Sequence, residues 1–144
     1  MKVALLGTGA CWILAGCITI NDQTPRSAEA QSGMPTSMIR GALSGKRQLI
    51  ASFYATAPDC TSLGYPTLKV AKPPQHGQVF VEQGTAFADF ASDNPRHICN
   101  GKEVPATVIY YTSENGYIGA DAVKFERIGI AGAYQVHDFT INVR

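Results

Sequence analysis

The feature that most constrains this chain is a series of short apolar runs separated by turn-forming residues. The runs are rich in β-branched and aromatic side chains, and none has the 3.6-residue period of an amphipathic helix. Fourteen glycines and eight prolines are scattered along the chain, which favours many tight turns. We expect strands over residues 47–55, 66–74, 77–84, 85–90, 105–113, 121–130 and 133–144. About seven strands in about 100 residues predict an all-β fold, an antiparallel β-sandwich.

The alternation within the last run predicts which of its side chains face the core. Phe139, Ile141 and Val143 share one phase and are expected to point inward. The apolar residues at the start of the run fall in the opposite phase. We therefore expect a β-bulge near His137 or Asp138, with His137 facing outward beside it.

The first residues have the pattern of an export signal. Lys2 gives a minimal positive start, and residues 3–14 form an apolar stretch too short to span a bilayer. Residues 14–17 read LAGC, which resembles the lipobox of bacterial lipoproteins. The resemblance implies that residues 1–16 are a cleaved signal peptide and that Cys17 carries the lipid. Two or more acyl chains, at about 0.8 kcal/mol per buried CH₂, would hold the protein on a membrane.

The residue after the cysteine bears on sorting. Ile18 is not the Asp that resembles an inner-membrane retention signal in enteric bacteria, so the likeness favours an outer-membrane anchor facing the periplasm. Two alternatives stay open, an ordinary signal peptide and an uncleaved anchor helix, each with a chance cysteine. Three glycines weaken such a helix, since each costs about 1 kcal/mol in a helix interior.

The segment after Cys17 is rich in Ser, Thr, Gly, Pro and Ala and has no sustained apolar period. Residues 17–45 are therefore predicted to be a flexible tether, with a short helical turn over 37–43 as an alternative. The folded domain is expected over residues 46–144.

Cys60 and Cys99 are the two cysteines in the expected folded part. An exported location permits a disulfide bond, and two cysteines allow one pairing. A disulfide bond that closes the loop of about 40 residues between Cys60 and Cys99 would stabilise the fold by roughly 4 kcal/mol in the chain-entropy model. Neither cysteine lies in a CxxC pair, so a metal site has less support than a disulfide.

Three segments carry a family resemblance: PPQHGQV (73–79), VIYYTSENGYIGADAVKFE (108–126) and FTINV (139–143). Together they resemble bacterial cadherin-like and related immunoglobulin-like domains. The resemblance implies an immunoglobulin-like sandwich in which Gly77, Gly116, Gly119 and Asp121 form structural turns. The Asp- and Asn-rich calcium motifs of cadherins are absent from the sequence, so neither calcium nor any other cofactor is predicted.

Several function classes have little support. A net charge of +1 without a Lys/Arg run disfavours nucleic-acid binding. The three histidines are not in zinc-site spacing, and G-x-S-x-G does not occur. We predict no metal site, no catalytic residue and no enzymatic activity.

The remaining prediction is a cell-envelope lipoprotein with a structural or interaction module, whose partner is an envelope protein or glycan. The alternative is a periplasmic inhibitor of a cell-wall hydrolase that acts through residues 91–100, next to Cys99. An exposed and rigid loop would favour the inhibitor. A cluster of tyrosines on one sheet would favour adhesion, and a cleft with converging His and carboxylate groups would favour an enzyme.

Overall fold

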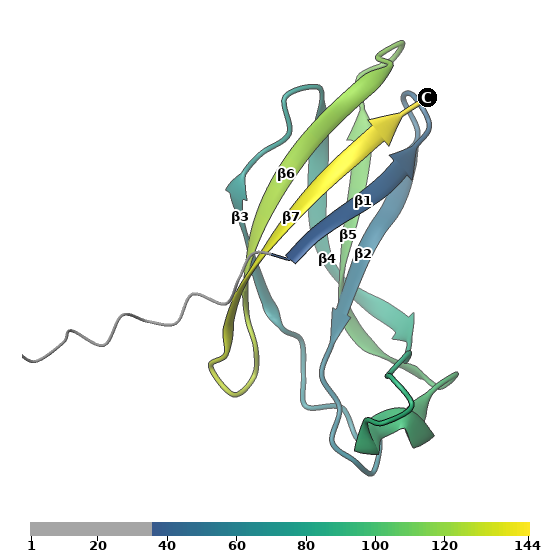
Figure 1. The fold of residues 1–144 in the computed structure, drawn as a ribbon, viewed down its shortest axis with the longest axis vertical. Coiled ribbons are helices and arrows are strands. Elements are labelled where there is room, and N and C mark those ends of the chain that lie inside the picture. Colours follow the sequence, from purple (N-terminus) through teal and green to yellow (C-terminus); the bar gives the residue numbers. More distant parts are fainter. Residues whose placement is uncertain (1–35) are drawn as a thin grey trace, which may run out of the picture.

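The computed structural model describes residues 36–144, so the predicted signal peptide, Cys17 and most of the predicted tether lie outside the described residues. The described part is a β-sandwich (Figure 1). Its elements are β1 (Thr36–Ala42), β2 (Arg47–Tyr54), β3 (Thr67–Lys72), β4 (Gly77–Phe87), the 3₁₀ helix η1 (Pro95–Cys99), β5 (Glu103–Ser113), β6 (Gly119–Ile128) and β7 (Tyr134–Val143).

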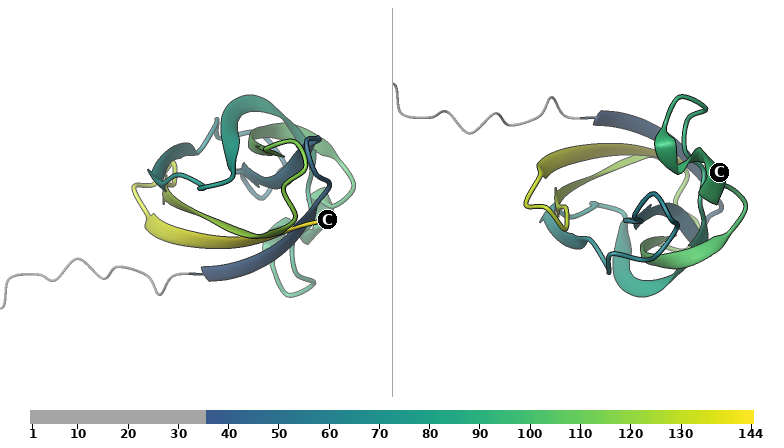
Figure 2. Two further views of the ribbon diagram at one scale, coloured as in Figure 1. Left: turned by 90° about the horizontal axis from the view of Figure 1, so that it is seen from above. Right: turned by 90° about the horizontal axis from the view of Figure 1, so that it is seen from below.

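The strands form two sheets with the orders β1-β7-β6-β3 and β2-β5-β4. Seen along the strands, the sheets lie as two layers (Figure 2). Seven strands divided in this way make the fold the expected immunoglobulin-like sandwich. One pairing differs from the expected antiparallel pattern, because β1 runs parallel to β7. The turn after β1 takes the chain into the other sheet, so β1 does not form a hairpin with β2 and lies beside the last strand.

The domain begins earlier than residue 46. Strand β1 lies within the predicted tether, and neither a flexible segment nor a helical turn is present over 37–43. Every second residue of β1 points inward, and Arg40 is one of these residues. Because Arg40 is charged, the sequence of β1 does not show the apolar alternation of a strand. The Arg40 guanidinium donates from Nε to the Ile50 carbonyl oxygen at 2.6 Å and lies over the Phe139 ring.

Strand β4 joins the run expected over 77–84 to residues 85–87 of the run expected as a separate strand over 85–90; residues 88–90 lie outside it. It pairs with β5 from Gly77 to Phe87 without a shift in register. Gly84 does not end the strand. A Cβ at this position would lie 3.2 Å from a Val108 methyl carbon, so the glycine accommodates close packing.

The predicted bulge near His137 is wrong. Strand β7 pairs continuously with both β1 and β6, and the irregularities lie in β2, after Leu49, and in β3, after Val70. His137 shares the inward phase of Phe139 and is 6% exposed, so its predicted outward position is also wrong. A polar residue at an inward position interrupted the apolar alternation, whereas the strand itself is regular.

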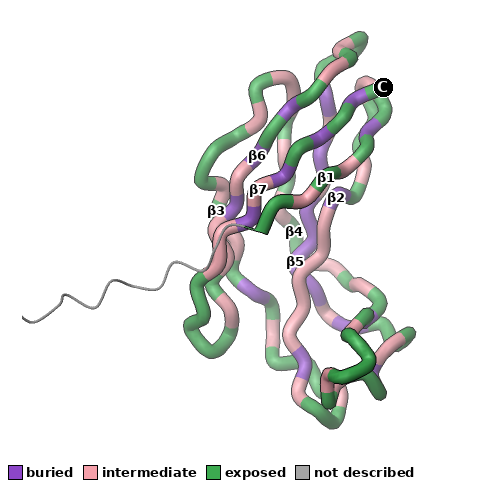
Figure 3. Tube along the Cα trace, in the orientation of Figure 1, coloured by how far each residue is buried: buried purple, intermediate pink, exposed green. Residues whose placement is uncertain are grey.

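The main core lies between the sheets and contains Tyr111, Phe125 and Phe139, the last two in an edge-to-face contact. Buried and exposed positions alternate along β6 and β7 (Figure 3). A second, smaller core joins Cys99 and Val104 to neighbouring apolar side chains. It anchors the long β4–β5 connection to the domain.

Candidate functional site

The first candidate site is the end of the domain formed by residues 55–66, 88–102 and 129–133, which we call the disulfide end. It lies at the bottom of Figure 1. Cys60 and Cys99 form the predicted disulfide bond there, with their Cα atoms 5.4 Å apart. The bond joins the β2–β3 connection to the β4–β5 connection, and Cys99 is fully buried.

The β4–β5 connection is held at several further points. The Asn94 side chain caps η1 by accepting from the Arg96 backbone N–H. Asn100 bonds the backbone of Phe90 twice, accepting from its N–H and donating to its carbonyl oxygen. Arg96 donates from Nε to the Thr56 carbonyl oxygen at 2.6 Å. These contacts fix the segment that the sequence indicated as a candidate contact loop.

Large apolar side chains collect on the surface of this end. Phe87 is 69% exposed and Ile98 is 68% exposed. A hollow of about 270 Å³ lies nearby, with Tyr54, Leu63 and Ile130 in its lining. Within residues 36–144, seven of the twelve exposed large apolar side chains lie at or next to the disulfide end: Leu63, Tyr65, Phe87, Ile98, Ile128, Ile130 and Tyr134. Two of them, Leu63 and Ile130, line the hollow together, and an exposed apolar hollow is typical of a protein contact surface.

The opposite end, which holds the C-terminus and the turns at 43–46, 73–76 and 114–118, is organised by Asp121. Its carboxylate accepts from the Gln75 and His76 backbone N–H groups and from the Tyr111 hydroxyl, at 2.9 to 3.0 Å. Burial opposes ionisation, but these bonds and one from the Ala122 N–H hold the pKa of Asp121 below its usual range. Burial and the bond to Asp121 raise the pKa of Tyr111. The hydrogen bonds of the Asp121 carboxylate therefore hold the 73–76 turn and the Tyr111 side chain in place.

Of the four residues predicted to form structural turns, Gly116 lies in a turn. Gly77 and Gly119 are the first residues of β4 and β6, and Asp121 lies within β6. Gly116 and Gly119 have φ values of 82° and 149°, which favour glycine. Gly77 is required by close approach, because a Cβ there would lie 2.6 Å from the Thr112 carbonyl oxygen. All three lie near Asp121 in the fold.

The histidines lie in different parts of the domain. The His76 ring stacks on Tyr117, and its Nδ1 lies 4.0 Å from an exposed Glu114 carboxylate oxygen. His97 belongs to η1. His137 is buried against Phe53, and burial, together with the nearby Arg127 charge, lowers its pKa. Within residues 36–144 no cluster of His, Cys, Asp or Glu is placed to hold a metal ion.

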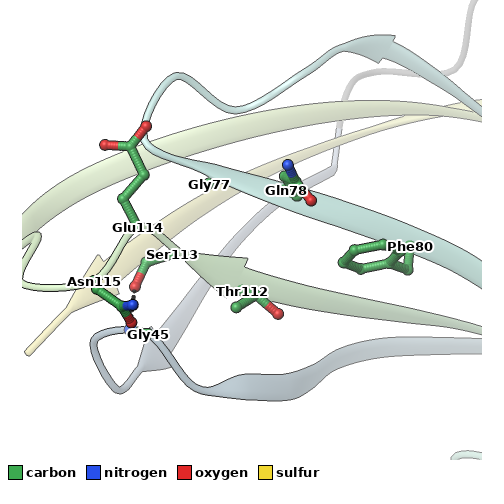
Figure 4. A pocket seen from close by; sticks show the side chains of 8 residues that line it. All are labelled: Gly45, Gly77, Gln78, Phe80, Thr112, Ser113, Glu114 and Asn115. Atoms are coloured by element: carbon green, nitrogen blue, oxygen red, sulfur yellow. Dashed lines mark hydrogen bonds between the residues drawn. The ribbon is translucent and has the colours of Figure 1, made fainter.

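A second candidate site lies on the outer face of the sheet β2-β5-β4. Leu49, Tyr110 and Phe80 are neighbours across the three strands, and the Arg47 guanidinium lies over the two rings. Beside Phe80 is a hollow of about 420 Å³ (Figure 4). Its lining residues include Gln78, Thr112, Glu114 and Asn115, and the Glu114 side chain points away from the other three.

Sequence reasoning did not find this second site. The outward phase of Phe80 was visible in its strand, but the hollow depends on pairing between distant parts of the chain. The tyrosines are not gathered on one sheet: Tyr111 is in the core, whereas Tyr65 and Tyr134 are near the disulfide end.

The chain matches no family model, no curated protein and no solved structure. Among the helices within residues 36–144, none has the length and apolar character needed to cross a membrane.

Proposed function

We propose that this chain is a non-enzymatic module of the bacterial cell envelope. A lipid on Cys17 holds it on the outer membrane, facing the periplasm, and its disulfide end contacts another envelope protein. The LAGC sequence at 14–17 and the disulfide bond support the location, since disulfides persist in oxidising compartments.

One observation supports the proposed contact surface: in the β4–β5 connection, an exposed apolar side chain lies next to a residue that is fixed by the disulfide bond. Ile98 projects from η1, while the adjoining Cys99 is buried and bonded to Cys60. A loop that is already ordered loses little conformational entropy on binding, so its apolar contacts contribute more to affinity. Such a loop suits recognition of a folded protein surface.

A second candidate function is the periplasmic inhibitor, for which an exposed and rigid loop is the expected feature. Helix η1 lies near the extreme of the long axis of the domain, with Ile98 exposed on it (Figure 1). A rigid projecting segment fits a concave surface, and inhibitors of hydrolases commonly bind in this way. The partner would then be a cell-wall hydrolase whose cleft the loop occupies.

The anchor is tested by the intact mass of the protein purified from its native membranes. We expect a chain that begins at Cys17 and carries acyl chains, with thiols at Cys60 and Cys99 that react only after reduction. An unmodified chain, or one that still bears Met1, would contradict the lipid anchor.

The contact surface is tested with two matched variants of the detergent-purified protein. Ile98→Asp places a charge on the loop tip, and Ile118→Asp does the same at the opposite end, where Ile118 is 74% exposed. For the inhibitor, digestion of purified cell walls by their hydrolases is measured. Inhibition that is lost with Ile98→Asp and kept with Ile118→Asp would support it, whereas no inhibition by the unaltered protein would exclude it for the hydrolases tested.

A further inference from the structure

We propose that the hollow beside Phe80 is a binding site for an N-acetylated oligosaccharide (Figure 4). The proposal rests on the envelope location given above, because that is where bacterial glycan polymers lie. It concerns a different surface from the disulfide end. The volume of about 420 Å³ is within the range of about 300–1,000 Å³ found for small-molecule sites.

Three polar side chains around the hollow are available to a ligand. The Gln78 and Thr112 side chains are neighbours across β4 and β5, and Asn115 follows β5. Among the hydrogen bonds within residues 36–144, none uses these two side-chain amides or this hydroxyl. An amide offers both donors and an acceptor, as a hydroxyl does. Sugar hydroxyl and acetamido groups need this same combination.

An apolar strip adjoins the polar groups. It runs from Phe80 across Tyr110 to Leu49, which is 54% exposed. The Arg47 guanidinium lies 4.1 Å from the Tyr110 ring centroid and is held by an ion pair of 2.7 Å with Glu82. Because the guanidinium covers part of both rings, a sugar ring contacts the strip beside it, at Leu49 and the ring edges. The guanidinium N–H groups that do not bond Glu82 supply further donors. The length of the strip favours an oligomer over a single sugar.

The charges and polar groups disfavour other ligand classes. The charge of Arg47, the cation beside the hollow, is already balanced by Glu82, so an anionic ligand would gain little from it. A purely apolar ligand would remove Gln78, Thr112 and Asn115 from water without giving them partners. A neutral ligand with many hydrogen-bonding groups satisfies both conditions.

The test is calorimetric titration of the detergent-purified mature protein with tetra-N-acetylchitotetraose. Maltotetraose, which lacks acetamido groups, is the control ligand. We expect saturable binding of the first saccharide and none of the second. The double variant Gln78→Ala/Asn115→Ala should weaken binding about tenfold or more. Asn142→Ala, an exposed change on the other sheet, should leave it unaltered.

Three results would overturn the proposal. One is no binding of the chitotetraose at about 10 mM, a concentration that fills even a weak site. The others are equal binding of both saccharides, and an effect of Asn142→Ala as large as that of the double variant. Ile98→Asp should not change saccharide binding. A failed titration with a functional disulfide end, or the reverse, would therefore separate this proposal from the proposed function.

Discussion

Replacing Asp121 with alanine should destabilise the fold by about 3 kcal/mol. The change removes the acceptor of two backbone N–H groups from the 73–76 turn and of the Tyr111 hydroxyl in the core. A buried donor without a partner costs about 1–3 kcal/mol; the Tyr111 bond is buried and the two backbone bonds are part-buried, so we take about 1 kcal/mol for each of the three. Such a loss is a large part of a typical stability of about 5–15 kcal/mol.

The assay is urea unfolding followed by circular dichroism, under non-reducing conditions. Asp138→Ala is the matched control, because Asp138 is a strand carboxylate in a partly exposed ion pair of 3.3 Å with Lys124. Such pairs contribute at most about 1 kcal/mol. The reasoning is refuted if Asp121→Ala is no more destabilising than Asp138→Ala.

Lowering the pH should remove the contribution of Asp121 to the free energy of unfolding. The pKa of Asp121 is lowered in the folded protein, so its stabilisation is complete above the ordinary pKa of 3.8. It is lost as the pH falls through the lowered folded-state value, because protonation removes the charged acceptor. Asp121→Asn should flatten this part of the stability–pH curve, measured as urea midpoints between pH 2 and pH 5.

Three further changes test other parts of the fold by urea unfolding. Replacing both Cys60 and Cys99 with serine should cost up to about 4 kcal/mol, and an unchanged midpoint would show that the bond contributes nothing. Burial lowers the pKa of His137, so the free energy of unfolding should fall as the pH drops below 6.5, the ordinary pKa of histidine, by up to about 1.4 kcal/mol per pH unit. A His137→Leu variant should lose this pH dependence. An equal pH dependence in both proteins would mean that other groups cause it. Gly77→Ala should cost about 1–3 kcal/mol because its Cβ meets backbone at 2.6 Å, whereas Gly41→Ala, with open space around it, should be nearly neutral; equal effects would contradict the packing argument.

Much of the sandwich was predictable because its strands alternate in a simple way. The runs at 105–113 and 121–130 overlap most of β5 and β6, and Val123 and Phe125 are buried as the alternation requires. The Cys60–Cys99 bond followed from the small number of cysteines and from the predicted exported location. The strands were predictable from the alternation of neighbouring residues, and the disulfide bond from the number of cysteines.

The failures have a common physical cause, which is that a side chain's environment depends on distant partners. Arg40 faces inward because the Ile50 carbonyl and the Phe139 ring receive its guanidinium. His137 faces inward because Phe53 packs against its ring. Gly84 continues a strand because Val108 fills the space beside it. None of these contacts is visible in the local pattern.

The same difference applies to the candidate sites. Residues 91–100 could be indicated from the sequence because the loop is continuous and adjoins Cys99. The hollow beside Phe80 could not, because Phe80 and Asn115 are brought together by the β4–β5 register and the following turn.

The most direct test of the central claim is site-specific photo-crosslinking in living cells. A photoreactive phenylalanine analogue is placed at position 98 on the disulfide end, or at position 118 on the opposite end. The account predicts a covalent adduct with one envelope protein from position 98, and no such adduct from position 118. No adduct from position 98, or the same adduct from both positions, would contradict a contact surface at the disulfide end.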